Sequence, residues 1–230
     1  MGNLATKHVD PAEATDNLVA AIRDEVPSAR VTTESSGSPT QPSFRGAFGH
    51  ELAGYFRSTE AIAFEVQADW TGPRPMRVQC RYVQVGRQAG PLSVLYLTRL
   101  RVVVPGTAVI RRKWARPLTR AVFDGDPTVK EPLAAAPGLG KGVARFLQPS
   151  LVIGNAVFKI EPFVEVDADD DGALFAAFTT PARGSHGFGG YHLDIRAFLE
   201  IADAVERTLT AAPGTRPVDH PNIPLPGAAA

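Results

Sequence analysis

Three runs of sequence decide the fold of this chain: IAFEVQADW (62–70), MRVQCRY (76–82) and VLYLTRLRVVV (94–104). Within each run the even positions are mostly apolar or aromatic, and the charged side chains fall on odd positions. A period of two is typical of a β-strand that buries one face. The connections TGPRP (71–75) and GRQAGP (86–91) have the composition of turns. The runs therefore predict an antiparallel meander that buries its even-numbered side chains in one core and leaves its guanidinium groups outside.

The first turn of this meander also predicts a register. A hairpin folded about residue 73 sets Asp69 opposite Arg77 and Glu65 opposite Arg81. Opposite charges at facing positions contribute roughly 0.2–1 kcal/mol per pair. We therefore expect Arg77 and Arg81 to have their partners within the sheet.

The rest of the chain adds a further hairpin and a closing helix. Residues 151–180 resemble two strands joined by DADDDG (167–172), whose Asp-Gly ending suits a positive φ. Asp194 is placed to cap a helix over 195–209 with an apolar stripe at spacings of three and four. Prolines in 117–150 leave room for only a short helix at 139–147. The fold class is α+β: an antiparallel β-sheet or partly closed barrel of about six or seven strands, packed by a C-terminal amphipathic helix.

We divide the 230 residues into three parts. Residues 1–43 hold a helix and a polar linker, residues 44–210 form a single α+β domain, and residues 211–230 form a proline-rich disordered tail. No apolar run reaches the roughly 18–20 residues of a membrane span, and the first residues lack the apolar core of a secretory signal. The single cysteine, Cys80, fits a reducing compartment, so we expect a cytoplasmic protein.

Charge is distributed unevenly although the formal net charge is zero. Between Trp70 and Phe123 there are eleven Arg and Lys residues and neither Asp nor Glu. Such asymmetry indicates either an anionic partner or pairing between two parts of the same fold. The densest part is the basic segment 111–120. Its candidate ligand-binding residues are Arg111, Arg112, Lys113, Trp114, Arg116 and Arg120.

The basic segment has two interpretations. Its cations, with the indole of Trp114, suit the phosphates or carboxylates of a membrane surface or a partner protein. Alternatively, the cations pair with the acidic turn 167–171 of the same chain. Nucleic acid is the less favoured ligand, because no nucleic-acid-binding motif accompanies the segment.

Two other patterns resemble functional sites. Asp167, Asp169, Asp171 and Gly172 match the start of a calcium loop, but Phe178 stands where the bidentate Glu belongs. We therefore predict a solvated hairpin turn and no metal. The glycine-rich loop 184–192 carries Ser185, His186 and His192 but has neither a nucleophile elbow nor a phosphate-binding loop pattern.

The sequence thus favours a non-catalytic binding or assembly protein that contacts an anionic surface through residues 111–120. One alternative is a small hydrolase or transferase with its site at loop 184–192. Another is a structural subunit that docks through its proline-rich tail. We expect no cofactor, and a homo-oligomer is left open.

Overall fold

The structure is a computed structural model. It describes residues 11–35, 61–70, 74–85, 88–115, 118–147, 152–153, 156–157, 162–179, 182–183, 191–219 and 225.

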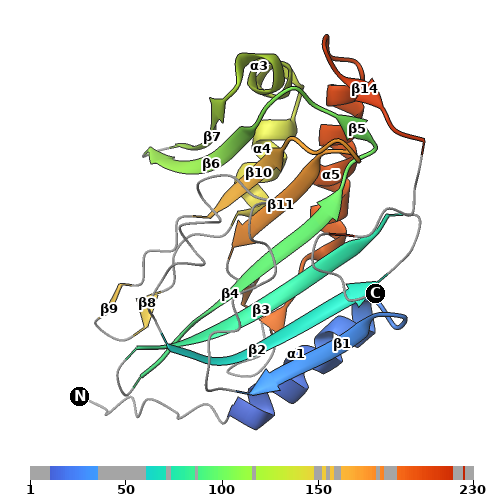
Figure 1. Ribbon diagram of the computed structural model, residues 1–230. Helices are drawn as coiled ribbons and strands as arrows, with labels where there is room; N and C mark the ends of the chain where they lie inside the picture. Colours follow the sequence, from blue (N-terminus) through green and yellow to red (C-terminus); the bar gives the residue numbers. More distant parts are fainter. Residues whose placement is uncertain are drawn as a thin grey trace.

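An antiparallel sheet of eight strands forms the body of the protein (Figure 1). Its order is β1 (Arg30–Ser35), β2 (Ala61–Trp70), β3 (Met76–Val85), β4 (Gln88–Arg99), β11 (Leu174–Thr179), β10 (Phe163–Asp167), β6 (Ala108–Ala115) and β7 (Leu118–Gly125). Among the described strands the sheet is open, with β1 at one end and β7 at the other, and they do not form the alternative of a partly closed barrel. The α+β class and the antiparallel sheet are confirmed.

Shorter strands form three two-stranded pairs outside this sheet. They are β5 (Val102–Val103) with β14 (Arg216–Pro217), β8 (Val152–Ile153) with β9 (Ala156–Val157), and β12 (Ala182–Arg183) with β13 (Tyr191–His192). The third run of the meander therefore breaks after Arg99, and its end pairs with a segment from the proposed tail. Of the proposed tail (211–230), the structure describes residues 211–219 and Leu225. The other residues of the tail lie outside the described ranges.

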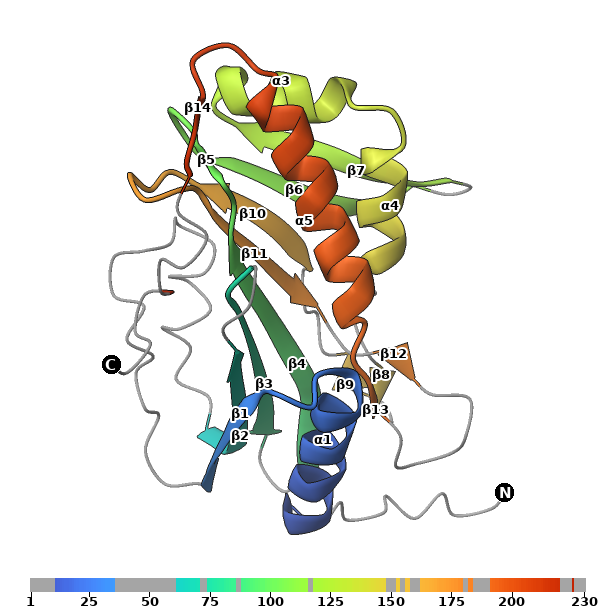
Figure 2. The same cartoon turned by 90° about the vertical axis from the view of Figure 1, so that its right-hand side faces the viewer.

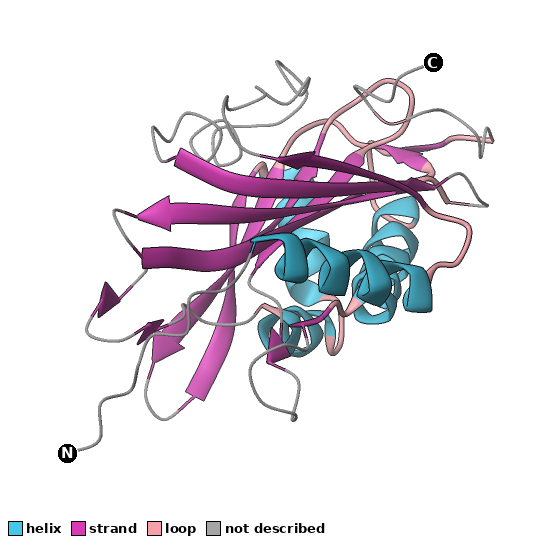
Figure 3. Cartoon of the chain, turned by 90° about the horizontal axis from the view of Figure 1, so that it is seen from below, coloured by secondary structure: helices cyan, strands magenta, loops and turns pink. Residues whose placement is uncertain are grey.

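Four described helices lie on one face of the sheet (Figures 2 and 3). They are α1 (Pro11–Glu25), α3 (Pro127–Ala135), α4 (Leu139–Phe146) and α5 (Ile195–Thr210). The short helix expected at 139–147 is confirmed as α4, whereas α3 was not anticipated. Asp126 caps α3 by accepting a hydrogen bond from the Thr128 backbone N–H, and Pro127 stands where a missing N–H costs nothing. Pro132 removes only one intrahelical bond, so nine residues still form a helix.

The meander has the expected register and core. Asp69 lies opposite Arg77, and Glu65 lies opposite Arg81. The even-numbered side chains described in β3 and β4, including Val78, Cys80 and Tyr96, are fully or almost fully buried on the side of the helices. The parity that the sequence predicts is therefore confirmed.

The odd-numbered face departs from the prediction. The side chains of Arg77, Gln79 and Arg99 are buried, as are those of Leu95 and Leu97. The three polar side chains face members of a second apolar cluster across the strands. The members of this cluster are Leu95, Leu97, Val109, Phe163, Leu174, Ala176, Phe178 and Leu225. The expectation that the guanidinium groups lie outside was wrong for Arg77 and Arg99. The reason is that the central strands are apolar on both faces, as buried strands are.

Aromatic rings lie between α5 and the sheet. The ring centroid of Phe198 lies 5.2 Å from that of Tyr96 in β4 and 5.3 Å from that of Phe175 in β11. The ring of Phe146 from α4 meets Tyr96 edge-on at 5.6 Å. Burial raises the pKa of Tyr96 well above its usual value, so its phenol stays neutral.

The turn between β10 and β11 requires a glycine. Gly172 has φ of 110°, and a Cβ atom there would lie 2.3 Å from the carbonyl oxygen of Leu100. The positive φ expected of the Asp-Gly pair is thereby confirmed. Backbone and neighbour both oppose any side chain at this position.

We expect Gly172→Ala to lower the free energy of unfolding by about 1–3 kcal/mol, because it adds both strain and a clash. Gly142→Ala is the matched control, because no atom lies within 4 Å of a Cβ at this position in α4. The control should raise stability by about 0.5–1 kcal/mol. Urea unfolding followed by circular dichroism measures both, and equal stabilities of the two variants would contradict the account.

Candidate functional site

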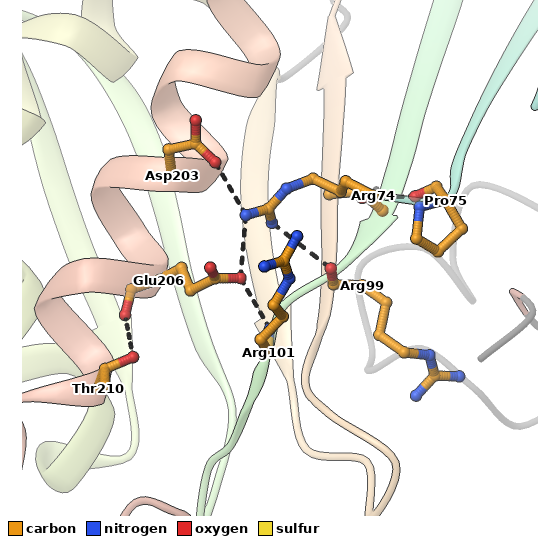
Figure 4. Close-up of polar contacts among 8 residues, drawn as sticks. Arg74, Pro75, Arg99, Arg101, Asp203, Glu206 and Thr210 are labelled. Atoms are coloured by element: carbon orange, nitrogen blue, oxygen red, sulfur yellow. Dashed lines mark hydrogen bonds and ion pairs between the residues drawn. The ribbon is translucent and has the colours of Figure 1, made fainter. Parts of the chain in front are cut away.

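Residues 71–122, which contain neither Asp nor Glu, form the acid-free stretch. Its first arginine, Arg74, pairs with acids of the same chain. It lies between β2 and β3, and its Nη2 contacts Asp203 at 2.8 Å and Glu206 at 3.0 Å, both on α5 (Figure 4). Glu206 also accepts a hydrogen bond of 2.7 Å from the backbone N–H of Arg101. The Arg74 guanidinium therefore links α5 to the β2–β3 connection, and Glu206 links α5 to the backbone that follows β4.

Arg77 and Arg99 are likewise paired within the fold. Arg77, almost fully buried, donates to the Asp69 carboxylate, which Gln67 also supports with a hydrogen bond of 2.7 Å. Arg99 donates to Asp169 at 2.7 Å and to the carbonyl oxygen of Gly172 at 2.8 Å. Three of the eleven cations between residues 70 and 123 are thus paired with acids from outside this stretch.

Removing the Asp69 carboxylate tests this pairing. Because Asp69→Ala takes a carboxylate from a buried guanidinium, and because Asp69 itself is one-third exposed, we expect a loss of about 2 kcal/mol of stability. Glu200→Ala is the control, since it removes the partner of Arg196 in a pair whose side chains are 88% and 65% exposed. The control should change stability by less than about 0.5 kcal/mol. Denaturant midpoints measure both, and an unchanged midpoint for Asp69→Ala would contradict the role assigned to this pair.

The basic segment is divided by the alternation of β6. Ala108 and Ile110 belong to the helix-side core, and Arg112 shares their face. Its Nη1 donates to the carbonyl oxygen of Leu147 at the C-terminal end of α4. Burial lowers the pKa of the Arg112 guanidinium. Arg112 therefore binds a carbonyl oxygen at the end of α4 and does not belong to the opposite face of the hairpin.

The other cations gather on the opposite face of the β6–β7 hairpin. Arg111, Lys113 and Arg120 lie there with Asp124, and we call this set the cationic hairpin face. Arg111 contacts Asp124 at 3.3 Å. Lys113 and Arg120 stand directly opposite one another in the ladder, and both are exposed. Neither forms an ion pair with any side chain that the structure describes.

The structure thus brings together three of the six residues predicted from the segment. Arg112 is directed to the helix side of the sheet, the side chain of Trp114 is not described, and Arg116 lies outside the described residues. Pairing with the acidic turn is not observed among the described side chains. Instead, Asp167 accepts from Thr107 and Asp169 accepts from Arg99.

The helix-side partners of the arginines were missed by sequence reasoning. Asp203 and Glu206 are three residues apart on α5, a spacing that places both on one side of a helix. This pattern indicates a shared cationic partner. It does not identify Arg74, which lies 129 residues away from Asp203 in the chain.

The two other sequence patterns do not come together as a site among the described residues. Asp167 and Asp169 also accept hydrogen bonds from the backbone N–H groups of Ala168 and Asp171, so these carboxylates hold their own turn. No group of three or more metal-ligating side chains occurs in the described ranges. His192 lies in β13 beside α1, away from the turn between β10 and β11 (Figure 2), and Ser185 and His186 lie outside the described residues.

Comparison with known proteins gives no match: no family model, no curated protein and no solved structure is similar to this chain. Among the helices that the structure describes, none has the length and apolar character to cross a bilayer.

Proposed function

We propose that this chain is a non-catalytic binding protein that contacts an anionic partner through its cationic hairpin face. The observation that carries the proposal is the facing pair of exposed cations, Lys113 and Arg120. Like charges directly opposite one another on a sheet are destabilising. An anionic group placed between them replaces this repulsion with two attractions.

An acidic protein surface suits this face better than a membrane does. Each basic residue near an anionic bilayer contributes about 1 kcal/mol, so Arg111, Lys113 and Arg120 together supply about 3 kcal/mol at most. Asp124 lies on the same face and opposes that attraction. Carboxylates of a protein partner, in contrast, can pair with arginine through two parallel hydrogen bonds. A protein partner can also contact the strand surface between the charges.

Three arginines elsewhere in the acid-free stretch are already paired within the fold, which restricts the proposed site to the cationic hairpin face. Arg74, Arg77 and Arg99 have carboxylate partners, so they add little to an external site. Cys80 is a buried free thiol, consistent with the cytoplasmic location that we include in this proposal.

The test compares two double charge reversals. Lys113→Glu/Arg120→Glu should weaken binding to poly-L-glutamate about tenfold or more, because two attractions become repulsions. Arg196→Glu/Arg207→Glu changes the net charge equally on exposed positions of α5 and should leave binding nearly unchanged. Fluorescence anisotropy at several salt concentrations provides the measurement, and binding should weaken as salt rises.

Two results would overturn the proposal: no binding of the parent chain at low salt, or equal losses in both double variants. Vesicles containing phosphatidylserine are measured in parallel. Stronger and Lys113-dependent binding to those vesicles than to poly-L-glutamate would overturn the choice of a protein partner and assign the face to a membrane.

A further inference from the structure

The outer edge of β7 is an open edge of the eight-stranded sheet among the described strands. β7 ends the sheet and pairs only with β6 among the described strands. Ala121, Val122 and Phe123 are half-buried, whereas every residue of β11 is buried. An open edge presents backbone N–H and C=O groups to any strand that can approach it.

The register shows which backbone groups point outward. The backbone N–H of Asp126 donates to the carbonyl oxygen of Thr107, one step beyond the facing pair Ala108 and Gly125. Hydrogen-bonded and non-hydrogen-bonded pairs alternate along an antiparallel ladder. The even-numbered residues of β7 therefore bond to β6, and the backbone groups of Ala121 and Phe123 face away from the sheet.

The side chains of this edge are complementary to their own reversed copy. Arg120 and Asp124 lie on the same face, two residues on either side of Val122. If a second β7 runs antiparallel with Val122 opposite Val122, each Arg120 faces the Asp124 of the other copy. Ala121 then faces Phe123, and these two residues can exchange both of their outward hydrogen bonds.

We propose that β7 of one copy pairs antiparallel with β7 of a second copy, centred on Val122. The charges favour this partner. An edge with charges of one sign repels its own copy, whereas this edge carries one charge of each sign in mirrored positions. The ion pairs fall at non-hydrogen-bonded positions, where facing side chains lie closest. The side chain of Asp124 is 58% exposed, which leaves it accessible to a second partner beside Arg111.

The pairing extends the surface that we propose as a binding site. A two-fold axis normal to the sheet keeps the helices of both copies on one side and both cationic hairpin faces on the other. In the dimer Arg120 pairs with Asp124 of the other copy, so an anionic partner would meet Arg111 and Lys113 of two adjacent copies, which raises the strength of binding through multivalency. The dimer itself rests on the edge and not on the proposed function.

The test uses two variants with opposite charge changes, Arg120→Asp and Asp124→Arg. Alone, each sets like charges opposite one another at two symmetric positions and should weaken the dimer at least about tenfold. Mixed in equal amounts, the aspartates of one variant face the arginines of the other at both positions. The mixture should therefore recover a mass of twice the 24.5 kDa of one chain.

Sedimentation velocity measures these masses at concentrations up to roughly 1 mM, the weak limit of specific association. A parent chain that stays a monomer throughout overturns the proposal. So does a dimer that survives both single substitutions, because another surface must then hold it. Failure of the mixture to dimerise while the parent does so would overturn the antiparallel register.

Ala121→Pro provides a second variant that leaves the charges in place. It removes an outward N–H without removing a hydrogen bond to β6, and edge strands tolerate proline at such positions. A monomer with unchanged far-ultraviolet circular dichroism supports the proposal, and a dimer like that of the parent overturns it. Lys113→Gln separates this inference from the proposed function, because it removes a cation of β6 without giving Arg120 a carboxylate in its own chain. It should weaken binding to poly-L-glutamate and leave the mass of the dimer unchanged.

Discussion

Burial of both faces of the central strands is the constraint on which the rest of this structure depends. β4 and β11 place side chains in the helix-side core and in the second apolar cluster at once. Arg99 of β4 and Arg77 of the neighbouring strand β3 are then buried. A buried guanidinium is strongly unfavourable without a paired acceptor, so each one has to find a carboxylate or carbonyl oxygen nearby.

This requirement explains why the two halves of the charge distribution meet. The acid-free stretch supplies the guanidinium groups of Arg74, Arg77 and Arg99, and α5, β2 and the β10–β11 turn supply the acids. The pairs also connect elements that are distant in sequence, as between Arg74 and α5. Lys113 and Arg120, which form no ion pair with a described side chain, lie instead at the β6–β7 end of the sheet.

Local patterns predicted more of the fold than of the candidate site. The period of two in the meander predicted strand register, down to Asp69 opposite Arg77, because facing residues follow directly from the position of one turn. The Asp-Gly turn was predicted for the same reason, since φ at Gly172 is a local property. For the basic segment, alternation could have separated Arg112 from its neighbours, but only with knowledge that residues 108–115 form a strand covered by α4 on one side.

The sequence by itself determined the strands of the meander and of the β10–β11 hairpin, where the meander turns, and that positive and negative charge are unequally distributed along the chain. These features depend on neighbours a few residues apart. Only the tertiary structure decided which charges remain outside, because burial of the second face and the partners of each arginine depend on contacts between segments as far apart as Arg74 and Asp203. The position of β7 at the end of the sheet was also decided there, since strand order results from pairing between segments distant in the sequence.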